Sequence, residues 1–385
     1  MHPILNHLAL RREESVELIR HMVCCESPTD APSAVTAMAG LVAELTRDIA
    51  KARLVNCGSR VGKALMLEFN LPGPKRKTGA GILGLGHIDT VWPVGTLKTM
   101  PFRREDGRLW GPGIFDMKGG LAFFVQAMRA LRDLDMAVKR PVRMWLAPDE
   151  ETGSDASRAK TEKHALAHSV VMVMEPALGA AGNLKTARKG VGVYTIKAHG
   201  IASHAGVDFA AGASAITEIA RQIVRISSFC DLGKGLTLNP GTVSGGGRHN
   251  VVADLAMAEI DVRVRRLRDF TALDRRIQKL RAEDSRCSLT IEGGLNRPPM
   301  ERTPAIASLF RLAKRIAAHD LGVALGESET GGGSDGNFTA GAGVPTLDGL
   351  GAVGEGAHAP HESLYEDRID ERIALAALLV HHLGQ

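Results

Sequence analysis

The chain has 385 residues, of which 44% are hydrophobic and 24% charged, a balance typical of a globular protein long enough for two domains. The 48 Lys and Arg residues exceed the 43 Asp and Glu residues and give a formal charge of +5, but basic and acidic residues are interspersed, which argues against nucleic-acid binding. No apolar stretch reaches the roughly 18 residues of a membrane span, and the first residues lack the pattern of a signal peptide, so we expect no membrane partner and a cytoplasmic location.

Helical periodicity marks the first part of the chain, over residues 8–25 and 33–50. An apolar run at 81–85 follows and ends abruptly in His87 and Asp89, as expected of a buried strand that leads into a site. Residues two apart in an extended strand point to the same side, so His87 and Asp89 are presented together. An imidazole and a carboxylate in this arrangement make up half of a metal site, with both residues as candidate ligands.

Two further apolar runs have the same character. Residues 142–147 lead into the pair Glu150 and Glu151, and residues 169–174 end at Glu175. Apolar strands that alternate with helical segments predict an α/β domain with a mainly parallel sheet. Ligands of such sheets bind beyond the carboxyl ends of the strands, where these acidic residues are expected.

The middle of the chain predicts a different domain, because strict alternation of apolar and polar residues over 256–265 indicates a half-exposed antiparallel strand. The order of expected elements is β-α-β-β-α-β, which is typical of a ferredoxin-like α+β sandwich. These elements are a strand at 191–198, a helix at 212–228, strands near 236–243 and at 256–265, a helix at 271–283 and a strand at 287–292. We expect a catalytic domain in two parts, 1–188 and 298–385, with the second domain inserted at 189–297, and a helix at 303–320 that returns the chain to the first domain.

Metal-capable side chains recur in short motifs along the chain. The motifs contain His87 and Asp89, Asp116, Glu150 and Glu151, Glu175, and His358 and His361. Histidines and carboxylates without thiolates suit a borderline divalent ion such as Zn²⁺. Two metals close together need a bridging carboxylate, which Asp116 is able to supply, while one of Glu150 and Glu151 binds metal and the other takes a proton from water.

Each motif also has a simpler explanation when it is taken alone. Asp116 could cap a helix over 117–131, and adjacent glutamates commonly lie in a solvated loop. Histidines in a Pro-containing loop, such as His358, are commonly surface residues, and the pair at 381 and 382 is expected to be structural. The succession of all the motifs in one chain favours the metal site.

In order and content, these motifs resemble those of the aminoacylase/carboxypeptidase family of co-catalytic zinc hydrolases, and the resemblance spans nearly the whole chain. It implies a zinc-exopeptidase-like catalytic domain with an inserted dimerisation domain, in a homodimer. It also implies two Zn²⁺ ions per subunit, with Co²⁺ or Mn²⁺ as substitutes. His87 and Glu175 match ligands of one metal, Glu151 and His358 match ligands of the other, and Asp116 matches the bridge.

The resemblance assigns the neighbouring residues as well. Glu150 matches the general base. Asp89 matches the acid that orients His87, so the resemblance implies that Asp89 is not itself a metal ligand. A metal-bound imidazole needs its other N–H held, so that role is physically sensible. The family also implies a cis peptide between Asp116 and Met117.

Further residues of the resemblance fall mainly in the second domain. His204 matches a histidine that reaches the partner subunit's active site and stabilises the oxyanion. Asn250, Arg297 and Gly333 match positions that hold the substrate's free carboxylate, a task to which an arginine fork is suited. His361 departs from the pattern, since relatives usually carry an acidic or amide residue there.

The resemblance therefore implies a dinuclear zinc hydrolase that cleaves an amide or peptide bond next to a free α-carboxylate, most like the glutamate carboxypeptidase branch. The substrate partner is then an N-acyl amino acid or a peptide. An N-acyl-amino-acid deacylase shares every site residue and is the first alternative. A catalytically silent dimeric binding protein on the same scaffold is an alternative of another class. A nucleotide binder is disfavoured because no complete phosphate-loop motif follows a strand.

Overall fold

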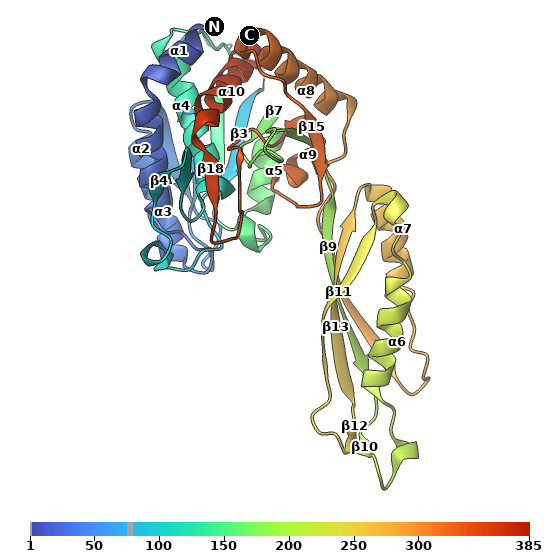
Figure 1. Cartoon of the computed structure of the whole chain (residues 1–385). Coiled ribbons are helices and arrows are strands. Elements are labelled where there is room, and N and C mark those ends of the chain that lie inside the picture. Colours follow the sequence, from blue (N-terminus) through green and yellow to red (C-terminus); the bar gives the residue numbers. More distant parts are fainter. Residues whose placement is uncertain (1, 75–79) are drawn as a thin grey trace. The chain divides into compact units, whose positions relative to one another are not determined.

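The chain is described by a computed structural model over residues 2–74 and 80–385. The described residues form two compact units, each with its own core (Figure 1). Unit 1 comprises Met1–Ala187, Arg302–Thr330 and Ser334–Gln385, and unit 2 comprises Arg188–Glu301 and Gly331–Gly333. The sequence placed the inserted domain at 189–297, whereas the contacts assign the short segment Gly331–Gly333 to unit 2 as well.

Within the described part of unit 1, the main sheet has the strand order β1-β2-β6-β3-β7-β16. These strands are β1 (Ala50–Val55), β2 (Ala64–Phe69), β3 (Gly81–His87), β6 (Val142–Ala147), β7 (His168–Val173) and β16 (Thr346–Leu347). Strands β6, β3, β7 and β16 run parallel, while β2 pairs antiparallel with both β6 and β1. The sheet is therefore mixed, with its parallel part where the apolar runs predicted it.

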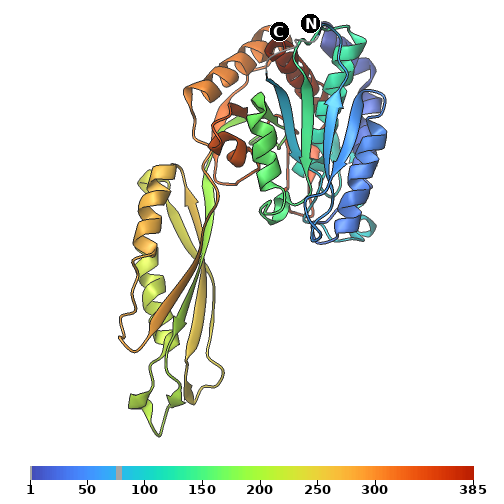
Figure 2. The ribbon, with the colours of Figure 1, turned by 180° about the vertical axis from the view of Figure 1, so that it is seen from behind.

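Helices cover both faces of this sheet (Figure 2). They are α1 (Pro3–Leu10), α2 (Arg12–Val23), α3 (Pro32–Leu45), α4 (Gly119–Asp133), α5 (Arg158–Leu166), α8 (Pro304–Ile316), α9 (Gly336–Gly341) and α10 (Ile369–Leu383). Neighbouring residues of β3 enter different cores: Ile82 packs with α4 and α10, and Leu83 and Leu85 pack on the other face. Every residue of β3 is buried, and such burial explains its continuous apolar run.

Two expected helices are shorter than the periodicity indicated. The helix expected at 8–25 is interrupted at Arg11 between α1 and α2, and the helix expected at 33–50 ends at Leu45. Residues 50–55 instead form β1, which sequence reasoning missed. This strand lies at the edge of the sheet with four of its six residues exposed, so it lacks the apolar pattern of a buried strand.

Smaller sheets complete unit 1. Among the described residues, one has the order β17-β18-β5-β4, and another pairs β15 with β8. Their strands are β4 (Arg103–Glu105), β5 (Arg108–Trp110), β8 (Leu184–Arg188), β15 (Glu327–Thr330), β17 (Gly354–Glu355) and β18 (Ser363–Tyr365). The sheet that contains β18 bears on the predicted metal site because the loop between β17 and β18 carries His358.

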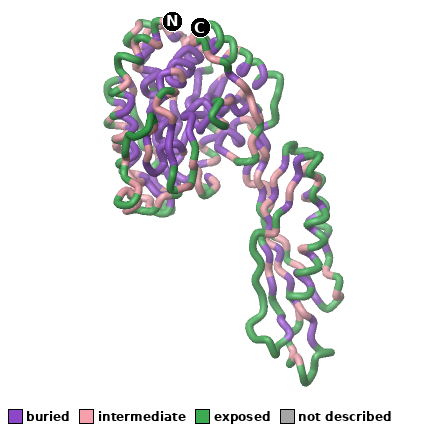
Figure 3. The backbone as a smooth tube through the Cα atoms, in the orientation of Figure 1, coloured by how far each residue is buried: buried purple, intermediate pink, exposed green. Residues whose placement is uncertain are grey.

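Unit 2 has the element order β-α-β-β-α-β. Its elements are β9 (Gly190–His199), α6 (Ala215–Ser227), β11 (Thr237–Gly245), β13 (Leu255–Val264), α7 (Leu267–Ile277) and β14 (Ser288–Arg297). The strands pair antiparallel in the order β11-β13-β9-β14, the ferredoxin-like arrangement. Alternate residues of β13, from Ala256 to Val264, are buried against the two helices (Figure 3).

A short ladder extends unit 2 beyond this sheet, where β10 (Ser203–His204) pairs antiparallel with β12 (Val251–Val252). Among the described residues of the whole chain, no helix has the length and apolar character needed to cross a membrane.

Candidate metal centre

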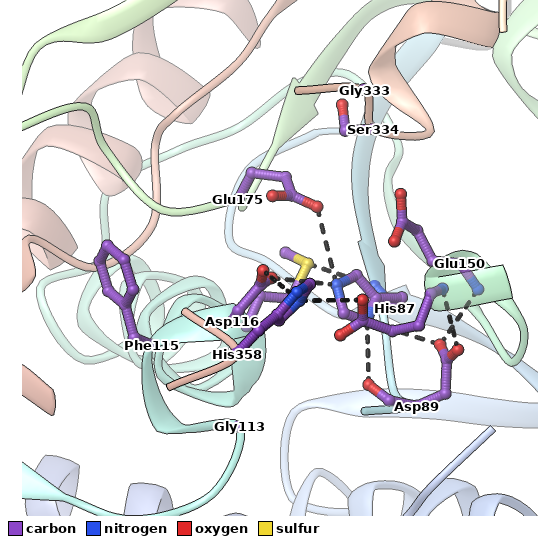
Figure 4. A network of polar contacts seen from close by, with 12 residues as sticks. His87, Asp89, Gly113, Phe115, Asp116, Glu150, Glu175, Gly333, Ser334 and His358 are labelled. Atoms are coloured by element: carbon purple, nitrogen blue, oxygen red, sulfur yellow. Dashed lines mark hydrogen bonds and ion pairs between the residues drawn. The ribbon is translucent and has the colours of Figure 1, made fainter. Parts of the chain in front are cut away.

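His87 is the last residue of β3, and its imidazole is 1% exposed. Its Nε2 atom lies 3.3 Å from Oδ1 of Asp116 and 3.7 Å from Oε1 of Glu175 (Figure 4). Its Nδ1 atom faces the opposite way, 3.0 Å from the carbonyl oxygen of Asp89 and 3.5 Å from the carboxylate of the same residue. The ring therefore offers Nε2 to the cluster and has Nδ1 held from behind.

Asp89 is buried and turned away from the cluster. Its Oδ2 accepts from the hydroxyl of Thr29 at 2.7 Å and from the backbone N–H of Glu151 at 3.2 Å, and its Oδ1 accepts from the N–H of Glu150 at 3.2 Å. This carboxylate joins the end of β3 to the turn after β6, so it fixes His87 and both glutamates relative to one another.

Asp116 lies in the turn Ile114–Lys118, and its carboxylate stands between two histidines. Oδ1 is 3.3 Å from Nε2 of His87, and Oδ2 is 3.5 Å from Nε2 of His358. The peptide between Asp116 and Met117 is cis, as the family resemblance implied. The interpretation of Asp116 as a helix cap is wrong, because α4 begins at Gly119 and its N-cap position is Lys118.

Three more carboxylates and a histidine complete the group. Glu150 and Glu151 form a short turn beyond β6, and Glu175 follows β7. Oε2 of Glu151 lies 3.1 Å from Nε2 of His358, which adopts a left-handed backbone conformation with φ of 62°. Figure 4 shows the side chain of Glu150 extending away from Asp89, while the backbone N–H of Glu150 donates to the Asp89 carboxylate.

The protonation of the group follows from these contacts. Contacts with Asp116 and Glu151 raise the pKa of His358 to about 10. Burial disfavours the charged form of His87, but its contacts with Asp116 and Asp89 raise its pKa well above the usual range. Burial raises the pKa of Glu151. An imidazole must be neutral to bind metal, so a metal held by His87 and His358 would displace these protons.

The donor set fits a divalent metal. Across residues 2–74 and 80–385, one group of His, Cys, Asp and Glu side chains is compact enough to hold an ion: single ligand atoms of His87, Asp116 and Glu151 lie within 4.8 Å of one another. Oε1 of Glu151 is buried and has no hydrogen-bond partner among the described residues. A buried carboxylate oxygen without a partner is costly, and a cation would satisfy it.

The other predicted residues belong to unit 2. The N–H of Ala205, which follows His204, donates to the carbonyl oxygen of Asn250, so these two predicted residues are neighbours. Gly333 packs against Arg297, since a Cβ on this glycine would lie 2.8 Å from the arginine Cδ. Their proposed contacts with substrate remain predictions. His361, the departure from the family pattern, is exposed.

Sequence reasoning assigned no role to Glu362, which is fully buried beside the turn that carries Asp116. It follows His361 in a motif that the sequence already marked, but its carboxylate contacts residues about 250 positions earlier in the chain. No local spacing reports such a contact. Thr29 was missed for the same reason, since it meets Asp89 only in the folded chain.

The geometry defines a candidate metal centre at the ends of the parallel strands of an α/β sheet. The profile of peptidase family M20/M25/M40 matches residues 84–382, and the chain belongs to this family. Relatives with related sequences include carboxypeptidase G2 of Pseudomonas sp. (strain RS-16), 29% identical over 87% of this chain and 82% of its own length. Acetylornithine deacetylase of Klebsiella pneumoniae (strain 342) is 31% identical over 51% of this chain and 53% of its own.

Solved structures share the fold. Aminopeptidase PepT from Bacillus cereus ATCC 10987 has a TM-score of 0.79 at 21% identity, over 97% of this chain and 99% of that one. The YXEP protein of Bacillus subtilis, described as a dinuclear metal binding peptidase from the M20 family, has a TM-score of 0.70 at 16% identity, over 98% and 99%. At these identities the likeness establishes the fold alone.

Proposed function

We propose that this enzyme hydrolyses an amide or peptide bond next to a free α-carboxylate, as a glutamate carboxypeptidase does. The observation that carries the proposal is Asp116 placed between His87 and His358, with Glu150 next to the ligand Glu151. The similarity to carboxypeptidase G2 over most of both chains supports the carboxypeptidase branch.

His87 and Glu175 would hold one Zn²⁺ ion, Glu151 and His358 would hold the other, and Asp116 would be shared between them. The relation to a dinuclear metal peptidase supports this number. When bound, such ions polarise the scissile carbonyl and lower the pKa of water.

Glu150 is the proposed general base. Its neighbour Glu151 contacts His358, while the backbone of Glu150 is fixed on Asp89. In this role its carboxylate takes a proton from the attacking water and passes it to the leaving amine.

Substrate recognition is assigned to unit 2, where Arg297, Asn250 and Gly333 would hold the α-carboxylate and His204 would donate a hydrogen bond to the oxyanion. Asn250 neighbours His204, so these two residues would reach the substrate from one subunit, and Arg297 and Gly333 from the other. Arg297 pairs with Val191 at the start of β9, whereas the ladder of His204 follows the other end of that strand. About 25 Å of strand separates the two ends. One substrate can meet both residues only if they come from different subunits, which supports a homodimer.

The second candidate function is N-acyl-amino-acid deacylation, supported by the similarity to acetylornithine deacetylase. The two activities differ in which side of the amide bond is selected, and they share the centre and the carboxylate contact.

A substrate panel tests the proposal. The enzyme is loaded with zinc, cobalt or manganese and offered peptides and N-acyl compounds that end in glutamate, beside N-acetyl derivatives of other amino acids. We expect preferred hydrolysis of the glutamate compounds and none when their α-carboxylate is methylated. If the N-acetyl amino acids are hydrolysed and the glutamate compounds are not, the enzyme is an N-acyl-amino-acid deacylase and the carboxypeptidase assignment is wrong. Hydrolysis of the methylated compounds would contradict recognition of the α-carboxylate.

A further inference from the structure

Glu362 is a buried carboxylate with a full set of hydrogen-bond donors. Its Oε1 accepts from the backbone N–H groups of Phe115 at 2.8 Å and Asp116 at 3.0 Å. Its Oε2 accepts from the N–H of Gly113 at 2.8 Å and from the indole Nε1–H of Trp92 at 2.7 Å. Each oxygen therefore accepts two hydrogen bonds, and three of the four donors lie in the turn that carries Asp116.

The charge of Glu362 is directed at the turn of Asp116. The side chain is 0% exposed, and its charge also interacts with the buried Lys118 at the end of that turn. Burying a carboxylate is costly, and here the cost is offset by four N–H donors, which an apolar side chain would leave without an acceptor. The carboxylate also orients the backbone, because hydrogen bonds to its two oxygens hold the donor N–H groups at fixed positions.

The backbone between Gly113 and Asp116 adopts an irregular conformation that these hydrogen bonds hold in place. Gly113 is in the left-handed region with φ of 70°, and Asp116 has non-helical dihedrals before α4 begins. The N–H of Asp116 is bound to Glu362, while its side chain faces His87 and His358. Fixing the N–H fixes the orientation of the residue, and thereby the direction of its side chain.

Glu362 also acts on a second part of the centre. It lies four residues after His358 on the same loop, and its own carbonyl oxygen accepts from the N–H of Gly111. One residue thus fastens the loop of His358 to the turn of Asp116. Trp92 brings in the segment that follows Asp89, three residues further along the chain.

We infer that Glu362 is a positioning residue of the metal centre. Through four N–H donors, it fixes the position of the Asp116 carboxylate relative to the loop of His358. The inference rests on the proposed function, in which Asp116 and His358 bind metal. It adds a residue that touches neither metal nor substrate and acts through the backbone of a ligand.

Glu362→Gln tests the inference while preserving shape. The amide retains one acceptor oxygen, but its NH₂ group faces two N–H donors that then lose their acceptor. We expect metal affinity to fall about 10- to 100-fold, the usual effect of losing a residue that supports a ligand. We also expect an altered Co²⁺ absorption spectrum and a lower kcat at metal saturation, with little change in KM.

Two variants serve as controls. Glu355→Gln changes an exposed carboxylate on β17 that bonds to Arg108, and we expect wild-type metal affinity. Trp92→Phe removes one donor and leaves the three backbone donors, so its metal affinity should remain closer to wild type than that of Glu362→Gln. If Glu362→Gln does not fold, Glu362→Asp, which keeps the charge but is shorter, replaces it in the same comparison.

The outcomes are distinguishable. Wild-type metal affinity and an unchanged cobalt spectrum in folded Glu362→Gln would overturn the inference and leave the proposed function standing. A loss of affinity that only parallels the unfolded fraction in thermal melts would also overturn it. A wild-type protein that binds no metal would instead contradict the proposed function itself.

Discussion

Asp89 and His87 are two residues apart on one strand end, yet their side chains have different partners. The imidazole meets Asp116 and Glu175, whereas the carboxylate of Asp89 accepts from Thr29 and from the backbone after β6. Alternation along a strand predicted that both would face the same side. It did not predict that only one would face the cluster, because that depends on the donors nearby.

Asp89→Asn tests whether the hydrogen bonds of the Asp89 carboxylate support metal binding by His87. An amide nitrogen in place of Oδ2 cannot accept from the N–H of Glu151 or the hydroxyl of Thr29, and in place of Oδ1 it cannot accept from the N–H of Glu150. We expect zinc affinity to fall about 10- to 100-fold, measured by competition with a chelator of known affinity. Asp106→Asn, at an exposed turn, is the matched control. Unchanged zinc affinity in the Asp89 variant would show that the contact does not hold the ligand.

Motif order revealed the candidate ligands because their chemistry is carried by the residues themselves. His87, Asp116, Glu151 and His358 do approach one another in the fold. Glu362 could not be found in this way, since a carboxylate that binds backbone N–H groups leaves no mark on the sequence of those donors.

At the scale of elements, buried strands were easier to predict than exposed ones. Residues 81–85, 142–147 and 169–173 are mainly apolar, and they lie in β3, β6 and β7, which run parallel in the central sheet. β1 was missed because four of its six residues are exposed at a sheet edge. The pattern of a sequence reports burial, so an element whose residues face solvent gives a weak signal.

The first turn of α4 packs closely on the segment after β7, and this contact carries a prediction. A Cβ on Gly120 would lie 2.0 Å from the carbonyl oxygen of Met174, next to Glu175. We expect Gly120→Ala to lower the free energy of unfolding by about 1–3 kcal/mol, because the backbone must shift.

Gly40→Ala in α3 is the matched control, since its Cβ would meet nothing within 4 Å. In a helix interior this change should raise the free energy of unfolding by about 0.5–1 kcal/mol. Denaturant titrations at one fixed metal concentration measure both variants. Equal effects of the same sign would contradict the packing described for α4.

At the scale of the whole molecule, the residues assigned to one substrate lie at opposite ends of unit 2. Arg297 adjoins the start of β9, and His204 lies beyond its other end. The arrangement predicts that His204 acts in the partner's site. We expect the protein to sediment as a dimer.

Mixed dimers test this prediction. Glu150→Gln and His204→Ala should each be inactive as pure dimers. A hybrid of the two contains one site with an intact Glu150 and the intact His204 of the other chain, so mixing after reversible dissociation should restore activity. If His204 acted within its own chain, every site of the hybrid would lack one group and no activity would return.

Metal content and turnover, measured together in wild type and Glu150→Gln, test whether this is a dinuclear metal hydrolase with Glu150 as its base. We expect two bound metal ions per chain in both proteins, no hydrolysis by metal-free wild type, and a loss of about 10²–10⁴-fold in kcat for the variant, the size of a general-base contribution. Wild-type turnover by metal-loaded Glu150→Gln, or by the metal-free protein, would contradict this assignment.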